Sequence, residues 1–204
     1  MRGKFITVEG TEGVGKTTNI ELIRKLINER GVELVSTREP GGTFLAEEIR
    51  EMLLAKREEQ VNPTAELLLV FAARAQHIQE VIEPALARGA WVLSDRFTDA
   101  TFAYQGYGRG LSLDTISLLE GLVQGELQPD ITILLDIDVE LGLERARSRA
   151  ELDRFESEAL SFFERVRTGY LSRAKSQPER FRLVDAGQSL EKVQADITEL
   201  FSRL

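Results

Sequence analysis

The 204-residue sequence predicts an α/β fold in which helices cover both faces of one parallel five-stranded sheet, giving three layers. Short apolar runs rich in β-branched residues alternate with segments whose apolar residues recur at helical spacing. Each run has the length of a buried strand and is bounded by polar residues or Gly. No internal repeat and no linker rich in Pro, Gly or Ser interrupts this order, so we expect a single domain over residues 1–204.

The strands are expected, in chain order, at Phe5–Val8, Glu33–Ser36, Trp91–Ser94, Ile131–Leu135 and Phe181–Val184. The helices are expected around Ile20–Ile27 and Thr64–Arg88, and then at Leu113–Val123, Val139–Arg147, Glu158–Ala174 and Leu190–Phe201. In such a sheet, ligands bind outside the carboxyl ends of the strands. Functional residues should therefore follow directly after the first four strands.

Composition limits the partners of the chain. The formal charge of −8, from 26 basic and 34 acidic side chains, provides no overall field that attracts nucleic acid or anionic membranes. Phosphate groups must then be bound by Arg and Lys gathered locally. The chain has no Cys and a single His, His77, which excludes disulfides, thiolate metal sites and clusters of several histidines. No apolar run approaches the roughly 20 residues that cross a bilayer. We therefore expect a cytoplasmic protein with neither a membrane nor a nucleic-acid partner.

The end of the first strand carries the strongest signal. Residues 10–17 match G-x-x-x-x-G-K-[ST], the Walker A pattern, between an expected strand and an expected helix. The glycines let successive N–H groups face one centre, and the helix adds its positive dipole end. Lys16 would bind the β- and γ-phosphates of ATP, and the Thr17 hydroxyl would bind Mg²⁺. A chance Gly-rich turn would produce this pattern in roughly one chain in a hundred or fewer. The residues expected to bind the phosphates are Gly10, Thr11, Glu12, Gly13, Val14, Gly15, Lys16, Thr17 and Thr18.

The ends of the second and third strands each carry an arginine. Arg38 opens the segment Arg-Glu-Pro-Gly-Gly-Thr, and Arg96 follows Asp95. Two converging guanidinium groups can hold a phosphate in bidentate fashion. Asp95 occupies the position of a carboxylate that holds Mg²⁺. Arg38 taken alone could equally be a solvated loop residue, but the repetition at two strand ends favours binding.

Two pairs of residues fit a pocket for a planar base. Phe71 and Arg74 are three apart on one helix, and Thr101 and Gln105 are four apart after the third strand. An aromatic ring can stack on a base while a neighbouring Arg donates to a carbonyl oxygen. Spacing alone is a weak signal, and burial preferences place Phe71 in the core more readily than in a ligand site.

Four arginines crowd the end of one helix and the loop after it: Arg145, Arg147, Arg149 and Arg154. A charge run of this kind is usually a solvated, ion-paired helix end. It could equally be a mobile lid whose arginine reaches the transferred phosphoryl group, because the phosphate loop contains no arginine. The residues by themselves leave both interpretations open.

These motifs, with Ala103-Tyr104-Gln105-Gly106, give a sequence that resembles bacterial thymidylate kinase, a P-loop nucleoside-monophosphate kinase, over essentially its whole length. The resemblance implies the P-loop NTPase fold and transfer of the γ-phosphoryl group of ATP to dTMP, giving dTDP. It implies that Phe71 stacks on thymine, and that Arg74, Thr101 and Gln105 form hydrogen bonds with the polar edge of the thymine base. The acceptor 5′-phosphate would be held by Arg38, Arg50 and Arg96.

The resemblance also assigns the sugar contacts, the lid and the assembly. Glu12 would lie near the 3′-hydroxyl, and Tyr104 would crowd the 2′ position and favour deoxyribose. The lid would be residues 145–157, with Arg149 as its acting arginine, and the family is usually homodimeric. A phosphate monoester has a second pKa of about 6, so the acceptor needs no general base. The catalytic residues are expected to be Lys16, Asp95, Arg96 and Arg149.

Three alternatives remain open on the sequence. A deoxynucleoside kinase would phosphorylate a hydroxyl group and would need a carboxylate base such as Glu12 or Glu39. Another nucleoside-monophosphate kinase, such as one acting on a different pyrimidine, would differ only in its base pocket. A GTPase switch protein would normally need an Asn-Lys-x-Asp motif, and no Asn in this sequence is followed by Lys.

Overall fold

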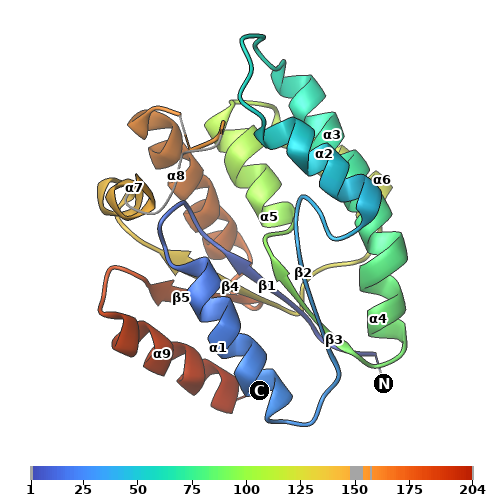
Figure 1. Ribbon diagram of the computed structural model, residues 1–204, viewed down its shortest axis with the longest axis vertical. Helices are drawn as coiled ribbons and strands as arrows, with labels where there is room; N and C mark the ends of the chain where they lie inside the picture. The colour runs from blue at the N-terminus through green and yellow to red at the C-terminus, as the bar shows by residue number, and fades with distance from the viewer. Residues whose placement is uncertain (1, 148–153, 157, 204) are drawn as a thin grey trace.

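A computed structural model describes residues 2–147, 154–156 and 158–203 (Figure 1). Within these residues, one sheet contains five strands in the order β2-β3-β1-β4-β5, and every neighbouring pair is parallel. The strands are β1 (Phe5–Glu9), β2 (Leu34–Arg38), β3 (Trp91–Asp95), β4 (Ile131–Asp136) and β5 (Phe181–Asp185). All five predicted strands are confirmed, and each extends one or two residues further toward the carboxyl edge than expected.

Most predicted helices are also confirmed. They are α1 (Lys16–Asn28), α6 (Leu113–Gln124), α7 (Val139–Arg147), α8 (Leu160–Ser176) and α9 (Leu190–Ser202). The expected helix over residues 64–88 is three successive pieces: α3 (Pro63–His77), the π-helical segment η1 (Ile78–Ile82) and α4 (Glu83–Ala87).

Two helical segments were not predicted. The first is α2 (Phe44–Leu54), whose N-terminus is capped by the Thr43 hydroxyl accepting from the Ala46 N–H. Apolar residues are not confined to its buried face, because Phe44, Leu45 and Met52 are exposed, so the sequence shows no clear helical period. The second is α5 (Thr98–Thr101), which continues into the π-helical segment η2 (Phe102–Gly108). Nearly all of its residues are buried, so no polar face marks a helical period.

Alternating side chains of the sheet supply two separate cores. Ile6 and Val8 of β1 pack in a cluster with residues of α1 and α9, such as Ile23 and Ile197. Phe5 points to the opposite face, where it packs with residues of η1 and α4. On that second face, α8 packs against η2 and β4. The two helix layers lie on opposite sides of the sheet (Figure 1), as the sequence predicts.

The connections after β1 and β3 create a crevice at the carboxyl edge of the sheet. These strands are neighbours, with Val8 opposite Asp95. The chain leaves β1 into α1 on one face and leaves β3 into α5 on the other. Adjacent strands whose connections diverge in this way open a ligand site between them. Among the helices of the described residues, none is long and apolar enough to cross a membrane.

Candidate active site

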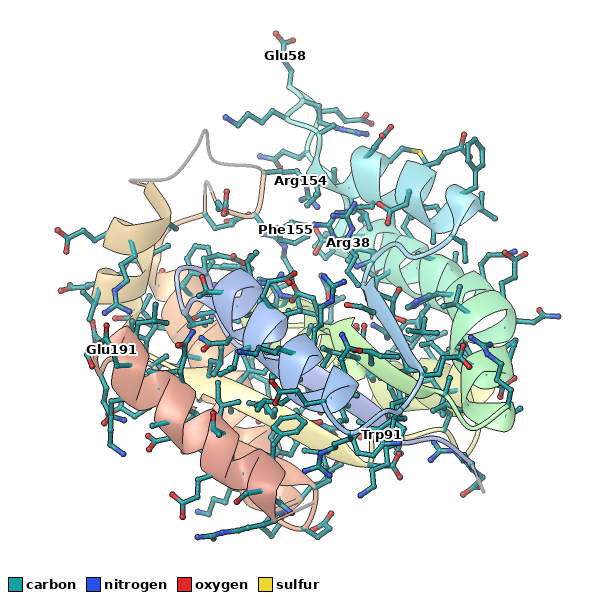
Figure 2. The ribbon with its side chains drawn as sticks, turned by 60° about the horizontal axis from the view of Figure 1, so that its bottom comes forward. Arg38, Glu58, Trp91, Arg154, Phe155 and Glu191 are labelled. Carbon is teal, nitrogen blue, oxygen red and sulfur yellow. The ribbon has the colours of Figure 1, made fainter. Side chains whose placement is uncertain are left out.

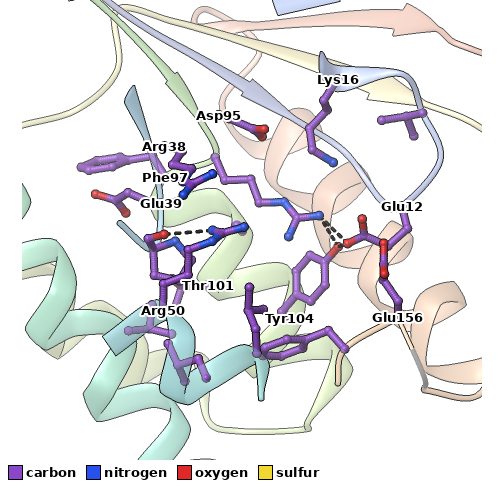
Figure 3. Close-up of a pocket in the computed structure, with 18 of the residues that line it drawn as sticks. Glu12, Lys16, Arg38, Glu39, Arg50, Asp95, Phe97, Thr101, Tyr104 and Glu156 are labelled. Carbon is purple, nitrogen blue, oxygen red and sulfur yellow. Dashed lines mark hydrogen bonds and ion pairs between the residues drawn. The ribbon is translucent and has the colours of Figure 1, made fainter. Parts of the chain in front are cut away.

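A cavity of about 410 Å³ opens at this crevice (Figure 3). It is lined by residues 12–17 of the phosphate loop, by the ends of β2 and β3, and by side chains of α2, α3 and η2. Glu12, Tyr104 and Glu156 lie on one side of the cavity, and Arg38 and Glu39 lie on the other. The topology therefore brings the predicted phosphate loop and the predicted arginines together in one pocket.

The phosphate loop has the backbone that its glycines permit. Gly10, Gly13 and Gly15 have positive φ values of 143°, 74° and 83°, a region that disfavours other residues. A Cβ atom at Gly13 would lie only 1.8 Å from the backbone oxygen of Gly142 in α7, so the loop packs directly on that helix. Residues 12–17 line the pocket, whereas Gly10, Thr11 and Thr18 are not among its lining residues.

Lys16 is folded back onto its own loop. Its Nζ donates to the carbonyl oxygens of Gly10 and Thr11, each at 3.1 Å. Burial lowers the pKa of Lys16, and the neighbouring Arg96 lowers it further, against the opposing effect of Glu12. A lysine held this way presents a positive charge at the loop, where the N–H groups of the loop and the N-terminus of α1 also favour an anion.

Arg96 adopts the left-handed conformation, with φ of 69°, alone among the non-glycine residues that the structure describes. Three hydrogen bonds fix this turn. The Arg96 N–H donates to the Val8 carbonyl at 3.0 Å, and the Ser94 hydroxyl donates to the Arg96 carbonyl at 2.7 Å. The Phe97 N–H donates to Glu9 Oε1 at 2.7 Å. A strained backbone that the surroundings hold in place is typical of functional sites. The turn directs the Arg96 side chain across the pocket.

The Arg96 guanidinium contacts Glu12 and Tyr104 there. Its Nη2 donates to Glu12 Oε1 at 2.5 Å and to the Tyr104 hydroxyl at 2.8 Å, and that hydroxyl donates to Glu12 at 2.8 Å. Its Nε is buried and has no hydrogen-bond partner among the described residues. Burial lowers the pKa of Arg96, but Glu12, Tyr104 and other acidic neighbours together outweigh burial and leave the pKa well above its ordinary value.

Glu12 is an anion throughout the neutral range. Burial raises the pKa of its carboxyl group, but Arg96 and Lys16 outweigh burial and lower the pKa to about 2. A general base works best when its pKa lies near the operating pH. Glu12 is therefore poorly suited to deprotonate a hydroxyl group, which argues against the deoxynucleoside kinase alternative.

Glu39 fixes the orientation of Arg74. Its buried carboxylate accepts from Arg74 Nε at 2.7 Å and bonds His77 Nδ1 at 2.9 Å, while His77 Nε2 bonds the Thr37 hydroxyl at 2.7 Å. Arg74 Nη2 donates to the Thr101 hydroxyl at 2.9 Å. Both Glu39 oxygens are thus engaged, so Glu39 is not a base candidate either. His77 is fully buried and holds the second Glu39 oxygen in place.

The predicted base-reading residues meet at one end of the pocket, with one exception. Arg74, Thr101 and Gln105 line it, and Arg74 Nη1 is buried without a hydrogen-bond partner in the described part of the chain. Phe71 is not among the lining residues and is 3% exposed, packed in a core cluster with Ile116. The ring of Phe71 lies 4.9 Å from the guanidinium carbon of Arg74. Its stacking on a base stays a prediction.

Arg38, at the end of β2, and Arg50, on α2, also line the pocket. Arg38 pairs with Glu47 through Nη2 at 2.9 Å, and Arg50 Nη1 donates to the Pro40 carbonyl at 2.9 Å. Burial lowers the pKa of Arg50, and the positive charges of Arg38 and Arg96 lower it further. These three guanidinium groups repel one another, so the site favours a multiply charged anion such as a phosphate.

Asp95 and Thr17 are the residues that fit Mg²⁺. Both line the pocket, and Asp95 Oδ1 is buried without a partner among residues that the structure describes. No cluster of three or more His, Cys, Asp or Glu side chains in the described residues could hold a metal ion by itself. Mg²⁺ usually takes one or two protein oxygens and completes its shell with water and substrate phosphates. The donor set therefore fits that ion in the presence of a nucleotide.

Glu9, beneath the Arg96 turn, carries a strongly shifted carboxyl group. Its Oε2 accepts from the Tyr170 hydroxyl at 2.8 Å. Burial, together with the Asp99 carboxylate, raises the pKa of Glu9 from 4.5 to about 8. At neutral pH the Glu9 side chain is therefore mostly protonated while it holds the Phe97 N–H.

This shift makes stability depend on pH in a direction that can be measured. Between pH 4.5 and about 8 the native state binds a proton at Glu9 that the unfolded state releases. Glu9 therefore contributes stability that is full below pH 4.5 and is lost as pH rises to about 8, by up to about 1.4 kcal/mol per pH unit. We expect the unfolding free energy of wild type minus that of Glu9→Gln to fall over this range in urea titrations. Replacing the exposed Glu126 by Gln should leave the pH dependence of the unfolding free energy unchanged. A difference between wild type and Glu9→Gln that does not vary with pH would contradict the raised pKa of Glu9.

The lid prediction falls partly outside the described residues. Arg149, with the rest of residues 148–153, lies outside them. Arg145 donates from Nη1 to the Ala186 carbonyl at 3.0 Å. Figure 2 shows Arg154 and Phe155 beside Arg38, below the loop that carries Glu58. Phe155 and Glu156, which lie within the predicted lid, line the pocket, although neither was assigned a contact of its own.

Comparisons with known proteins agree with this geometry. A model of the thymidylate kinase family matches residues 8–197. The chain is 68% identical to the thymidylate kinase of Teredinibacter turnerae over 197 residues, covering 97% of this chain and 96% of that protein. It is 59% identical to the thymidylate kinase of Pseudomonas fluorescens over 204 residues, covering 100% and 97%. The crystal structure of thymidylate kinase from Ehrlichia chaffeensis matches with a TM-score of 0.78 at 34% identity, covering 98% of this chain and 99% of that chain.

Proposed function

This chain belongs to the thymidylate kinase family, and on that premise we propose that its donor and acceptor nucleotides meet in the pocket described above. The chain is a dTMP kinase: it transfers the γ-phosphoryl group of ATP to dTMP, giving ADP and dTDP for dTTP synthesis. The observation that carries the proposal is the position of the phosphate loop directly opposite a group of arginines at the ends of β2 and β3. A phosphate donor and a phosphate acceptor both require such positive surroundings.

ATP would bind along the phosphate loop. The loop N–H groups and Lys16 would hold its β- and γ-phosphates, and Thr17 and Asp95 would hold Mg²⁺ between them. The acceptor phosphate would lie between Arg38, Arg50 and Arg96. Thymine would lie toward Arg74, whose Nη1 is buried and without a partner in the described residues and so can donate to a base oxygen. Glu12 and Tyr104 would face the deoxyribose.

The reaction would need positioning and charge neutralisation rather than a base. The acceptor oxygen of dTMP is already mostly anionic at neutral pH, because the second pKa of a phosphate monoester is about 6. Lys16, Arg96 and a lid arginine would stabilise the charge that spreads over the transferred group. Bound Mg²⁺ would supply further charge neutralisation at the phosphates. The low pKa of Glu12 and the fully bonded carboxylate of Glu39 support this assignment.

The test is a coupled ADP-release assay with ATP and Mg²⁺ against dTMP, dUMP, UMP, CMP, GMP and free thymidine. We expect strong turnover with dTMP and little with free thymidine. Turnover with free thymidine would place a hydroxyl group at the acceptor position and would require a carboxylate base. ADP release that does not depend on any acceptor would contradict the placement of both nucleotides in one pocket.

We propose that the protein is a homodimer that pairs through α2, α3 and α6, of which α3 packs against both others. These helices carry exposed apolar side chains, among them Phe44 (84% exposed), Leu68 (52%), Leu118 (74%) and Leu122 (79%). Large exposed apolar patches on a folded chain mark interaction surfaces.

The homodimer can be checked by light scattering. We expect wild type to show twice the 22.9 kDa mass of the chain. The Leu118→Asp and Leu122→Asp double variant should show the mass of one chain, because buried unpaired carboxylates are costly in an interface. A control substitution at Leu183, which is exposed on β5, should leave the dimer intact. A dimer that survives the double change would exclude this surface.

Two further assignments complete the proposal. We place the protein in the cytoplasm, where ATP and dTMP are available to it. We also propose that residues 1–204 form one catalytic domain, in which residues 145–157 close over the phosphates as a lid. Closure of such a segment would exclude water from the transfer reaction.

A further inference from the structure

Glu66 on α3 is fully buried and joins three parts of the chain. Its Oε1 accepts from Gln105 Nε2 at 2.9 Å and from Arg109 Nε at 3.3 Å. Its Oε2 accepts from Arg154 Nη2 at 2.7 Å and from Arg109 Nη2 at 3.4 Å. A buried carboxylate persists only when charged partners compensate it, and Arg109 and Arg154 do so here. The Gln105 amide carries no charge, so its bond to Glu66 is not needed for that compensation.

The carboxylate determines which way the Gln105 amide faces. An ionised carboxylate only accepts hydrogen bonds, so the amide must turn its NH₂ group toward Glu66. Gln105 lies in the buried segment η2 and lines the pocket. With its nitrogen engaged, Gln105 offers its carbonyl oxygen, an acceptor, to a ligand. The reverse orientation would bring two oxygens together and is disfavoured.

This acceptor completes a pattern that distinguishes pyrimidines. Arg74 offers only donors, and its Nη1 is buried without a partner in the part of the chain that the structure describes. Thymine presents a carbonyl oxygen at position 4 and an N–H donor at position 3. Cytosine presents an amino donor at position 4 and an acceptor nitrogen at position 3. A donor beside an acceptor therefore matches thymine or uracil and opposes both groups of cytosine.

We propose that Glu66 is a positioning residue that sets base specificity by holding the Gln105 amide with its oxygen toward the acceptor base. This inference rests on the proposed placement of the base beside Arg74 and Gln105. In Glu66→Gln, residue 66 can donate as well as accept, so the Gln105 amide is free to take either orientation. The discrimination between thymine and cytosine should then weaken, while the discrimination between thymine and uracil should not change.

The experiment measures dissociation constants of dTMP, dUMP and dCMP by calorimetric titration, with dCMP measured in competition with dTMP. For Glu66→Gln we expect the preference for dTMP over dCMP to fall about tenfold, the value of one well-placed hydrogen bond. The preference for dTMP over dUMP should stay within twofold. The matched control is Glu158→Gln, which also removes a carboxylate paired with Arg109 but makes no contact with Gln105. That control should leave both preferences unchanged.

A second variant and a second control keep the outcomes distinct. Glu66→Asp keeps the charge for Arg109 and Arg154 but withdraws the carboxylate from Gln105, and it should lower the same preference if Glu66→Gln does not fold. Equal weakening of all three nucleotides would mean a purely structural role and would overturn the inference. If Gln105→Ala lowers the preference but neither Glu66 variant does, Glu66 has no part in specificity. If Gln105→Ala changes nothing, the base does not lie beside Gln105, and the proposed placement fails with the inference.

Discussion

Replacing Arg96 by Lys is expected to lower kcat/KM with dTMP about 10²- to 10³-fold, the usual loss when an electrostatic stabiliser is removed from an active site. The guanidinium group bridges Glu12 and Tyr104 with one nitrogen and leaves its buried Nε available to a ligand. A lysine offers one compact charge and cannot reproduce this planar set of donors. The charge at position 96 is kept, so a loss of kcat/KM would come from the arrangement of the hydrogen-bond donors rather than from the net charge.

Steady-state kinetics and thermal unfolding together test this result. Lys faces the same left-handed backbone strain as Arg at position 96, so the melting temperature should change little. The matched control is Arg88→Lys, because Arg88 pairs with Glu33 on the surface at about half exposure. That control should retain wild-type kinetics, since exposed ion pairs contribute little. Wild-type kcat/KM in Arg96→Lys would remove Arg96 from the reaction.

Arg149→Ala is expected to lower kcat by about 10³-fold, as the loss of an arginine that stabilises phosphoryl transfer usually does. Three of the pocket arginines are ion-paired, Arg38 with Glu47, Arg74 with Glu39 and Arg96 with Glu12, and with Arg50 they are proposed to bind the acceptor. The phosphate loop supplies no arginine of its own. The proposed lid is therefore where we expect a further positive charge, and Arg149 itself lies outside the described residues.

The design separates chemistry from binding. An arginine that acts only on the transferred group should change kcat while the dissociation constant of dTMP stays within about threefold. Arg154→Ala serves as the control, because Arg154 is ion-paired with Glu66 and donates to the Leu53 carbonyl. It should cause a much smaller loss of kcat. Unchanged turnover in Arg149→Ala would move the catalytic arginine elsewhere.

The sequence predicts the sheet well because its strands are short and the three central ones are largely buried on both faces. Apolar runs such as Ile131–Leu135 stand out between polar segments, and parallel strands need no alternation to be recognised. The segment α5–η2 could not be recognised in the same way. Its residues are buried against α8, α6 and α3, so the sequence shows no helical period there.

The sequence predicts site residues where a motif fixes the backbone. It does not predict residues whose role depends on what packs around them in the folded chain. The phosphate loop and Arg96 follow from strand ends that topology brings together. Glu39 and Glu66 were given no binding role because a carboxylate in a sequence looks like a solvated charge, and only three-dimensional packing places arginines around it. Phe71 packs into the core, as its burial preference favours, and its stacking on a base stays a prediction.

The contact between Gly13 and Gly142 has a consequence for how this protein tolerates sequence variation. A Cβ atom at Gly142 would lie 2.6 Å from the backbone oxygen of Glu12, and a Cβ atom at Gly13 would lie closer still to Gly142. Backbone atoms on both sides leave no side chain that could move aside. In a saturation library, position 142 should therefore accept as few replacements as the phosphate loop itself. Such intolerance would look like the mark of a catalytic residue, although Gly142 would contribute nothing to the reaction except the absence of a side chain.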